Sequence, residues 1–116
     1  MALKMTTHEV DGVTVVALDG NVVLGEETSS LREKMTSLLT EGKKKLVLDM
    51  KNVTFIDSAG LGALVGIHHS ASTRGATMKL ANLGAKFKEL LQITRLLTVF
   101  DVSNTEADAV ASFSKK

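Results

Sequence analysis

The sequence predicts an α/β domain with a mixed β-sheet of about four to five strands and four helices, in the order ββαβαβαβα. Short β-branched and apolar runs alternate with stretches whose apolar residues recur at helical spacing. The first two runs are separated only by Asp11-Gly12, a pair typical of tight hairpins. Strands that then alternate with helices indicate a sheet that is at least partly parallel. We expect residues 1–116 to form one domain, because this length suffices for a single core.

The first half of the chain is predicted to contain a hairpin, a helix and a strand. The hairpin strands are residues 5–10 and 13–18, followed by a loop over residues 20–25. A helix follows, in which Ser30 and Glu33 can form a capping box unless it starts a turn earlier, and it ends at Gly42. Its apolar stripe consists of Leu31, Met35, Leu38 and Leu39. The basic triplet 43–45 is interpreted as a solvated turn, and residues 46–50 as the next strand.

The second half is predicted to continue the alternation. Residues 53–56 and 78–81 are predicted strands, and residues 59–73 and 84–93 are predicted helices. A final strand is expected at residues 97–102. The last helix should be capped by Ser103 and Glu106 and should bury Ala107, Val110 and Ala111.

Composition excludes several classes of protein. The 116 residues carry a formal net charge of +1 and include no Trp or Tyr, so neither a basic stripe nor aromatic stacking platforms favour nucleic-acid binding. The absence of Cys excludes disulfides and thiolate metal sites. No apolar run approaches the roughly 20 residues of a membrane span, and no secretory signal is recognisable, so we expect a cytoplasmic protein.

The stretch 57–66 is unusual for an ordinary core segment. It begins with Asp57-Ser58 at a strand-to-helix junction, and the helix it opens contains three glycines. Each glycine costs about 1 kcal/mol relative to Ala in a helix interior, so a packing or contact reason is expected. Close packing of helix on sheet is the expected reason for Gly66. Room for the backbone of a partner protein is the expected reason for Gly60 and Gly62.

Ser58 has two interpretations. It can be the N-cap of the helix, accepting a hydrogen bond from a free backbone N–H, a role that Asp57 could also take. Alternatively it is a phosphate acceptor. A phosphoserine carries about −1.5 to −2 charges, which a helix N-terminus tolerates but a docked apolar or acidic partner does not. One modification could then release a partner without unfolding the domain.

Several phrases of the sequence resemble the STAS domain of the anti-sigma factor antagonist (anti-anti-sigma factor) family. The central phrase is LVLDMKNVTFIDSAGLG at residues 46–62, and further similarity lies at residues 80–83, 90–94 and 99–102. The resemblance implies that Ser58 is phosphorylated by an anti-sigma factor that is also a serine kinase of the histidine-kinase-like ATPase type. It implies that the unmodified protein binds this kinase, which frees a sigma factor for transcription, and that a serine phosphatase resets the switch. ATP and Mg²⁺ belong to the kinase, so no cofactor of the chain itself is implied.

The recognition surface is expected around Ser58, in a protein that is monomeric when free. Its predicted members are Asp57, Ala59, Gly60, Leu61 and Gly62, with Asn21, Val22, Val23 and Leu24 as a rim. Two features depart from better-known family members. The loop has no acidic residue between Gly20 and Glu26, and Ala59 stands where a second Ser is common.

Rival functions fit the sequence less well. A dinucleotide-binding enzyme would need glycines in the turn that Asp57 and Ser58 occupy, and there is no Gly-x-Ser-x-Gly element for a serine hydrolase. His68 is expected to be partly buried and His69 solvated, because adjacent helix residues point about 100° apart and do not share a ligand. Within the family, a scaffold role in a stressosome-type or lipid-transport complex, with Ser58 only a helix cap, remains the alternative.

Overall fold

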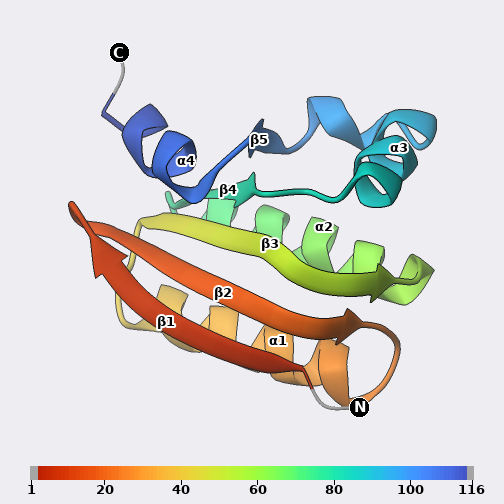
Figure 1. Cartoon of the computed structure of the whole chain (residues 1–116). Helices are drawn as coiled ribbons and strands as arrows, with labels where there is room; N and C mark the ends of the chain where they lie inside the picture. Colours follow the sequence, from red (N-terminus) through yellow and green to blue (C-terminus); the bar gives the residue numbers. More distant parts are fainter. Residues whose placement is uncertain (1–2, 115–116) are drawn as a thin grey trace.

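The computed structural model describes residues 3–114, apart from the side chain of residue 97, and shows a five-stranded mixed sheet with four α-helices (Figure 1). The predicted fold class and element order are confirmed. The elements are β1 (Lys4–Val10), β2 (Val13–Val22), α1 (Glu26–Thr40), β3 (Lys45–Ile56), α2 (Ser58–Thr73), β4 (Thr77–Ala81), α3 (Ala85–Ile93), the 3₁₀ turn η1 (Leu96–Thr98), β5 (Asp101–Ser103) and α4 (Glu106–Ser112).

The strands lie in the order β1-β2-β3-β4-β5. β1 and β2 form the predicted antiparallel hairpin, and the other three pairings are parallel. Asp11 and Gly12 have φ angles of 51° and 80°. Positive φ at both central residues defines the turn type whose twist matches that of the flanking strands, and Asp-Gly adopts it readily.

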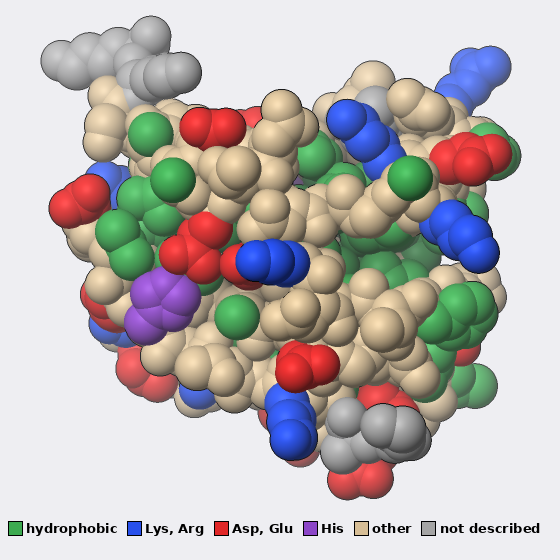
Figure 2. All heavy atoms as spheres, in the orientation of Figure 1, with side chains coloured by type: hydrophobic (Ala, Val, Ile, Leu, Met, Phe, Trp, Pro, Cys, Tyr) green, Lys and Arg blue, Asp and Glu red, His purple; other side chains and the backbone are tan. Residues whose placement is uncertain are grey.

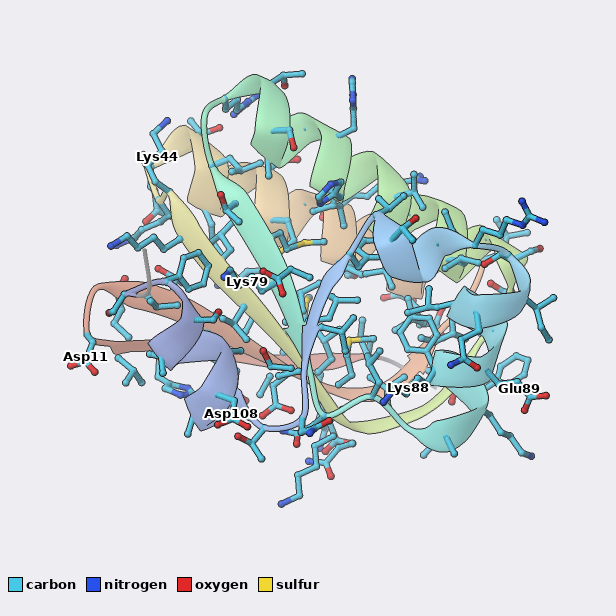
Figure 3. The ribbon with its side chains drawn as sticks, turned by 90° about the horizontal axis from the view of Figure 1, so that it is seen from above. Asp11, Lys44, Lys79, Lys88, Glu89 and Asp108 are labelled. Atoms are coloured by element: carbon cyan, nitrogen blue, oxygen red, sulfur yellow. The ribbon has the colours of Figure 1, made fainter. Side chains whose placement is uncertain are left out.

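Helices cover both faces of the sheet. Figure 3, viewed from above, shows α1 and α2 side by side on one side of the sheet and α4 on the other. The main core lies beneath α1 and α2; α3 adds Leu91 to it, and the turn between η1 and β5 adds Phe100. A smaller cluster lies beneath α4, where Ala109 and Val110 pack on Val15 and Val47. The predicted apolar stripe of α1 is confirmed, because its four residues are all buried.

The segments 46–50 and 53–56, predicted as two strands, form one continuous strand. β2 also extends beyond its predicted end, to Val22, and its pairing with β3 runs from Leu46 to Ile56. Two register irregularities, between Ala17 and Asp19 and between Gly20 and Asn21, keep the pairing intact past the polar residues of β3. Long-range pairing of this kind carries β3 through Lys51-Asn52, where the sequence predicted a break between two strands.

Two predicted helix caps are wrong. α1 begins at Glu26 with Gly25 as its N-cap, the earlier start that the sequence also allowed, so Ser30 and Glu33 lie inside the helix and form no capping box. In α4 the Oγ1 atom of Thr105 accepts the capping hydrogen bond from the Asp108 N–H, at 3.0 Å. Ser103 instead ends β5.

The C-terminal segments also differ in detail. In α4 the helix phase buries Ala109 and Val110 and leaves Ala107 and Ala111 exposed, so only Val110 of the predicted set is buried. The predicted strand 97–102 is divided between η1 and β5. Its apolar character is explained by Phe100, which inserts into the main core from the turn between them.

Candidate functional site

The C-terminal ends of β2 and β3 bring together the two sequence segments predicted to form the recognition surface. Val22 and Ile56 are register partners in adjacent parallel strands. The loop after β2 and the first turn of α2 therefore begin at the same edge of the sheet. We call residues 21–24 and 57–62 the α2 entrance.

Asp57 is the N-cap of α2 and joins both segments of the α2 entrance. Its Oδ1 atom accepts a hydrogen bond of 2.8 Å from the Gly60 N–H. Its Oδ2 atom accepts one of 3.0 Å from the Leu24 N–H. The backbone N–H of Asp57 donates to the Val22 carbonyl oxygen at 3.3 Å. Asp57 therefore fixes the position of the loop relative to the helix.

The hydrogen bonds to Asp57 favour its ionised form. The Leu24 N–H makes the largest contribution to lowering the pKa of the Asp57 carboxyl, followed by the Gly60 N–H, while desolvation opposes them. Backbone N–H groups that point at a carboxylate stabilise its negative charge in this way. The capping carboxylate is thus ionised at neutral pH.

Ser58 occupies the first helical position and not the predicted N-cap position. Its side chain is exposed, and within residues 3–114 its hydroxyl group makes no hydrogen bond. The interpretation of Ser58 as the helix cap is therefore wrong, since Asp57 supplies the cap. The hydroxyl is left accessible at the positive end of the helix dipole, with no acidic residue in the first turn.

Close packing explains Gly60, contrary to the expectation from the sequence. A Cβ atom at Gly60 would lie 1.9 Å from the Val22 carbonyl oxygen, so only glycine fits there. A Cβ atom at Gly62 or Gly66 would have no heavy atom within 4 Å outside its own helix backbone. Close packing on the sheet therefore does not explain Gly66, and Gly62 is exposed as expected.

The predicted partner-binding residues differ in accessibility. Val22, Gly60 and Leu61 belong to the core of the domain. Leu24 is 76% exposed, and Gly62 is also exposed. The remaining members, Asn21, Val23, Asp57 and Ala59, are half-buried. The accessible part of the α2 entrance is thus the loop tip together with the outer side of the first helical turn.

Phe55 lies beside this region but was not among the predicted contact residues. Its side chain is 60% exposed at the end of β3. The sequence contained a signal for it, because successive strand residues point to opposite faces of the sheet, so Phe55 and Ile56 at the end of β3 cannot both face the core. Phe55 and Leu24 are two of the four large apolar side chains that the described residues expose, the others being Ile93 and Val99.

Among residues 3–114, His68 and His69 belong to no metal-binding cluster. His68 is half-buried and packs edge-on against Phe100, with ring centroids 5.5 Å apart, and His69 is exposed. Both placements agree with prediction. Residues 3–114 contain no cluster of three or more His, Cys, Asp or Glu side chains that could hold a metal ion. None of the helices in the described part is long and apolar enough to span a membrane.

Comparison with known proteins identifies the family. The model of the STAS domain matches residues 4–109, so the chain belongs to the STAS domain family. The anti-sigma-B factor antagonist of Bacillus subtilis is 37% identical over 73 residues, covering 63% of this chain and 66% of that protein. The anti-sigma F factor antagonist of Paenibacillus polymyxa is 27% identical over 112 residues, covering 95% and 94%.

Solved structures share the fold over nearly the whole chain. The Thermotoga maritima protein tm1081 has a TM-score of 0.88 at 23% identity, covering 96% of this chain and 95% of that one. The anti-sigma factor antagonist SpoIIAA in its unphosphorylated form has a TM-score of 0.75 at 16% identity, covering 97% and 100%. SpoIIAA from Bacillus has also been solved in its phosphorylated form, with a TM-score of 0.73 at 18% identity, covering 95% and 99%. The chain is thus a STAS domain protein with homologues named anti-sigma factor antagonists.

Proposed function

We propose that this protein is an anti-sigma factor antagonist whose binding is switched by phosphorylation of Ser58. The unmodified form binds an anti-sigma factor that is also a serine kinase, and the phosphorylated form releases it. The observation that carries the proposal is the division of roles between two adjacent residues. Asp57 caps α2, so the exposed Ser58 hydroxyl has no structural task and is accessible to a kinase.

A phosphate on Ser58 is compatible with the fold. The modification adds about −1.5 to −2 charges next to the N-terminus of α2, where the helix dipole favours anions. The first turn of α2 contains no acidic residue. Asp57 is the nearest fixed negative charge, and the N–H groups of Leu24 and Gly60 already stabilise it.

The same phosphate is expected to oppose partner binding. The backbone N–H of Leu24, whose side chain is exposed, is held against the first turn of α2 by Asp57, and the exposed Phe55 lies near the end of β3. Apolar side chains of this kind contribute to binding when a partner covers them and excludes water. A phosphate at the centre of such a contact would be desolvated without compensation, and each 1.4 kcal/mol of penalty reduces affinity about tenfold.

Two relatives support the choice of partner class. The Bacillus subtilis and Paenibacillus polymyxa proteins are named as antagonists of anti-sigma factors, and SpoIIAA, which has the same fold, exists in unphosphorylated and phosphorylated forms. A serine phosphatase would complete the cycle by removing the phosphate from Ser58. The protein itself acts in this scheme as a binding module and not as an enzyme.

The test is a pull-down from a lysate of the native host, with the Ser58→Ala and Ser58→Glu proteins as paired baits. The proposal predicts that the Ala form captures a histidine-kinase-like ATPase and that the Glu form captures much less of it. Ser72→Glu is the matched control, because Ser72 is exposed near the other end of α2. If both Ser58 variants capture the same proteins, the charge at Ser58 does not control binding and the proposal fails.

A further inference from the structure

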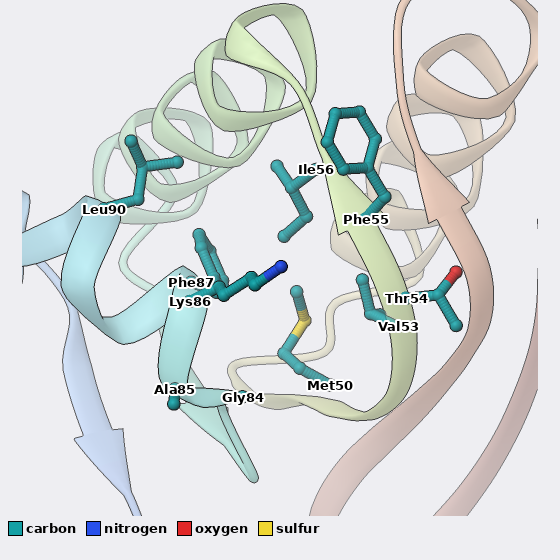
Figure 4. Close-up of a pocket in the computed structure, with 10 residues that line it drawn as sticks. All are labelled: Met50, Val53, Thr54, Phe55, Ile56, Gly84, Ala85, Lys86, Phe87 and Leu90. Atoms are coloured by element: carbon teal, nitrogen blue, oxygen red, sulfur yellow. The ribbon is translucent and has the colours of Figure 1, made fainter.

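A cavity of about 350 Å³ lies between α3 and the C-terminal half of β3 (Figure 4). Figure 2 shows the corresponding hollow, with hydrophobic side chains at its floor. Ligand-binding pockets generally measure about 300–1,000 Å³, so its volume suits a small molecule. Its lining consists of Met50, Val53, Thr54, Phe55, Ile56, Gly84, Ala85, Lys86, Phe87 and Leu90.

The topology of the sheet creates this cavity. β4 pairs with β3 only along Lys45–Asp49 and ends at Ala81. From Met50 to Ile56 the edge of β3 on that side therefore has no neighbouring strand, and α3 lies across the gap. The large apolar side chains that α3 contributes, Phe87 and Leu90, are only half-buried and do not close the gap.

The chemistry of the lining is asymmetric. Six of its side chains are large and apolar: Met50, Val53, Phe55, Ile56, Phe87 and Leu90. Lys86 is the one charged residue among the lining residues, and no carboxylate accompanies it. Its ammonium group makes no ion pair or hydrogen bond within residues 3–114, and Figure 4 shows its side chain extended toward β3 across the cavity.

The start of α3 adds to the positive potential at the same end of the cavity. Its N-cap, Gly84, lines the cavity and provides no side-chain acceptor for the free N–H groups of the first turn. Such N–H groups favour an anion. The cavity thus combines an apolar body with a single cationic edge.

We propose that this cavity binds a medium-chain fatty acid, with the alkyl chain between β3 and α3 and the carboxylate on the Lys86 ammonium group. One carboxylate matches one lysine, whereas a nucleotide would bring several negative charges to a lining with a single cation. This inference goes beyond the proposed switch at Ser58, because Ser58 does not line the cavity. Either proposal can fail while the other stands.

The test titrates the isotopically labelled protein with decanoate, below its micellar concentration, and follows backbone amide resonances by NMR. Saturable shifts are expected at Met50, Lys86 and Phe87. Decanol, which has the same chain without the charge, should bind about ten- to a hundredfold more weakly, the range expected for loss of a charge-assisted contact. Butyrate, which has the charge without the chain, should not saturate.

Variants test whether Lys86 and the cavity itself bind decanoate. Lys86→Glu and Lys86→Met should each weaken decanoate binding at least tenfold, and Ala85→Trp should obstruct the mouth of the cavity and abolish it. Lys88→Glu is the matched control, because Lys88 is exposed on the same helix and does not line the cavity, and it should change binding less than twofold. The proposal is overturned if decanoate gives no saturable shifts at the lining residues. It is equally overturned if decanol binds as tightly as decanoate, or if Lys88→Glu has the same effect as Lys86→Glu.

Discussion

The Oδ2 atom of Asp57 accepts a hydrogen bond of 3.0 Å from the backbone N–H of Leu24, 33 residues earlier in the chain. The other carboxylate oxygen of Asp57 caps α2 through Gly60. One side chain thus holds the loop after β2 against the first turn of the helix. This contact fixes the position of Leu24, whose side chain is exposed, relative to Ser58 at the start of the helix.

Asp57→Asn should weaken the attachment of the loop after β2 to α2, because it disrupts the hydrogen bond with the Leu24 N–H, and should leave the helix cap in place. The amide oxygen of Asn can still accept from Gly60, but its NH₂ group would then face the Leu24 N–H, which is also a donor. We expect the melting temperature to fall by a few degrees and the amide of Leu24 to exchange faster with solvent. Thermal unfolding and hydrogen exchange measure the two effects. Unchanged exchange at Leu24 would contradict the role assigned to Asp57.

The contribution of Asp57 should depend on pH in a defined direction. Its pKa is lowered in the folded protein, chiefly by the Leu24 N–H. Its stabilising contribution is therefore complete above the unfolded-state pKa of about 3.9 and is lost as pH falls through the lower folded-state value. The difference in unfolding free energy between the wild type and Asp57→Asn should be constant near neutral pH and shrink below about pH 4. Urea titrations across this pH range measure this difference in unfolding free energy. A difference that grows below about pH 4 would contradict the stabilising role of the ionised Asp57 carboxylate.

Gly60→Ala and Gly62→Ala should have opposite effects on stability. The new Cβ at Gly60 would overlap the Val22 carbonyl oxygen, and overpacking of this kind costs about 1–3 kcal/mol or more. Gly62 has open space, so Ala there should stabilise α2 by about 0.5–1 kcal/mol. Urea unfolding of both variants tests the packing. If Gly62→Ala also reduces capture of the partner, Gly62 lies in the contact surface.

Ser58→Ala should leave stability nearly unchanged. The hydroxyl of Ser58 is exposed and makes no hydrogen bond within the described residues, so a change of no more than about 0.5 kcal/mol is expected. Chemical denaturation measures it. A loss of 1 kcal/mol or more would mean that Ser58, and not Asp57, provides the capping interaction.

Leu24→Ser should weaken partner binding without destabilising the domain. Leu24 is 76% exposed, so its removal costs little in the free protein, but a buried apolar anchor typically contributes enough to change affinity about tenfold. Ile93→Ser is the control, because Ile93 is similarly exposed, at 72%, but lies on α3, outside the α2 entrance. Binding of the captured partner to both variants separates a local contact from general surface hydrophobicity. Equal losses for the two variants would place the interface elsewhere.

The strand-to-helix junction that carries the candidate site could be predicted from the sequence because it carries a strong local signal. Asp57-Ser58 followed by spaced glycines stands out from ordinary core, and the hairpin at Asp11-Gly12 fixed the start of the fold. The assignment of the cap could not be made, because Asp and Ser are almost equally good N-caps. Whether Asp57 or Ser58 is the N-cap depends on the hydrogen bond between the Asp57 N–H and the Val22 carbonyl, which joins segments 35 residues apart.

The remaining errors also arise from tertiary contacts. Which of three glycines meets the sheet depends on the rotation of α2 about its axis, and the structure places Gly60 there and leaves Gly66 in open space. The continuity of β3 depends on pairing with β2, and local propensity at Lys51-Asn52 does not reveal it. Alternation along β3 allows only one of Phe55 and Ile56 to face the main core, and the structure places Ile56 there and leaves Phe55 exposed.

The most direct test of the central claim is to map the phosphate and measure partner binding in one reaction. The partner captured by the Ser58→Ala protein is incubated with the wild-type protein, ATP and Mg²⁺, and mass spectrometry locates the modification while binding is followed in parallel. The account predicts a single phosphate on Ser58, its absence from Ser58→Ala, and loss of the complex as the phosphate appears. A phosphate at another residue, or a complex that persists after Ser58 is modified, would contradict it.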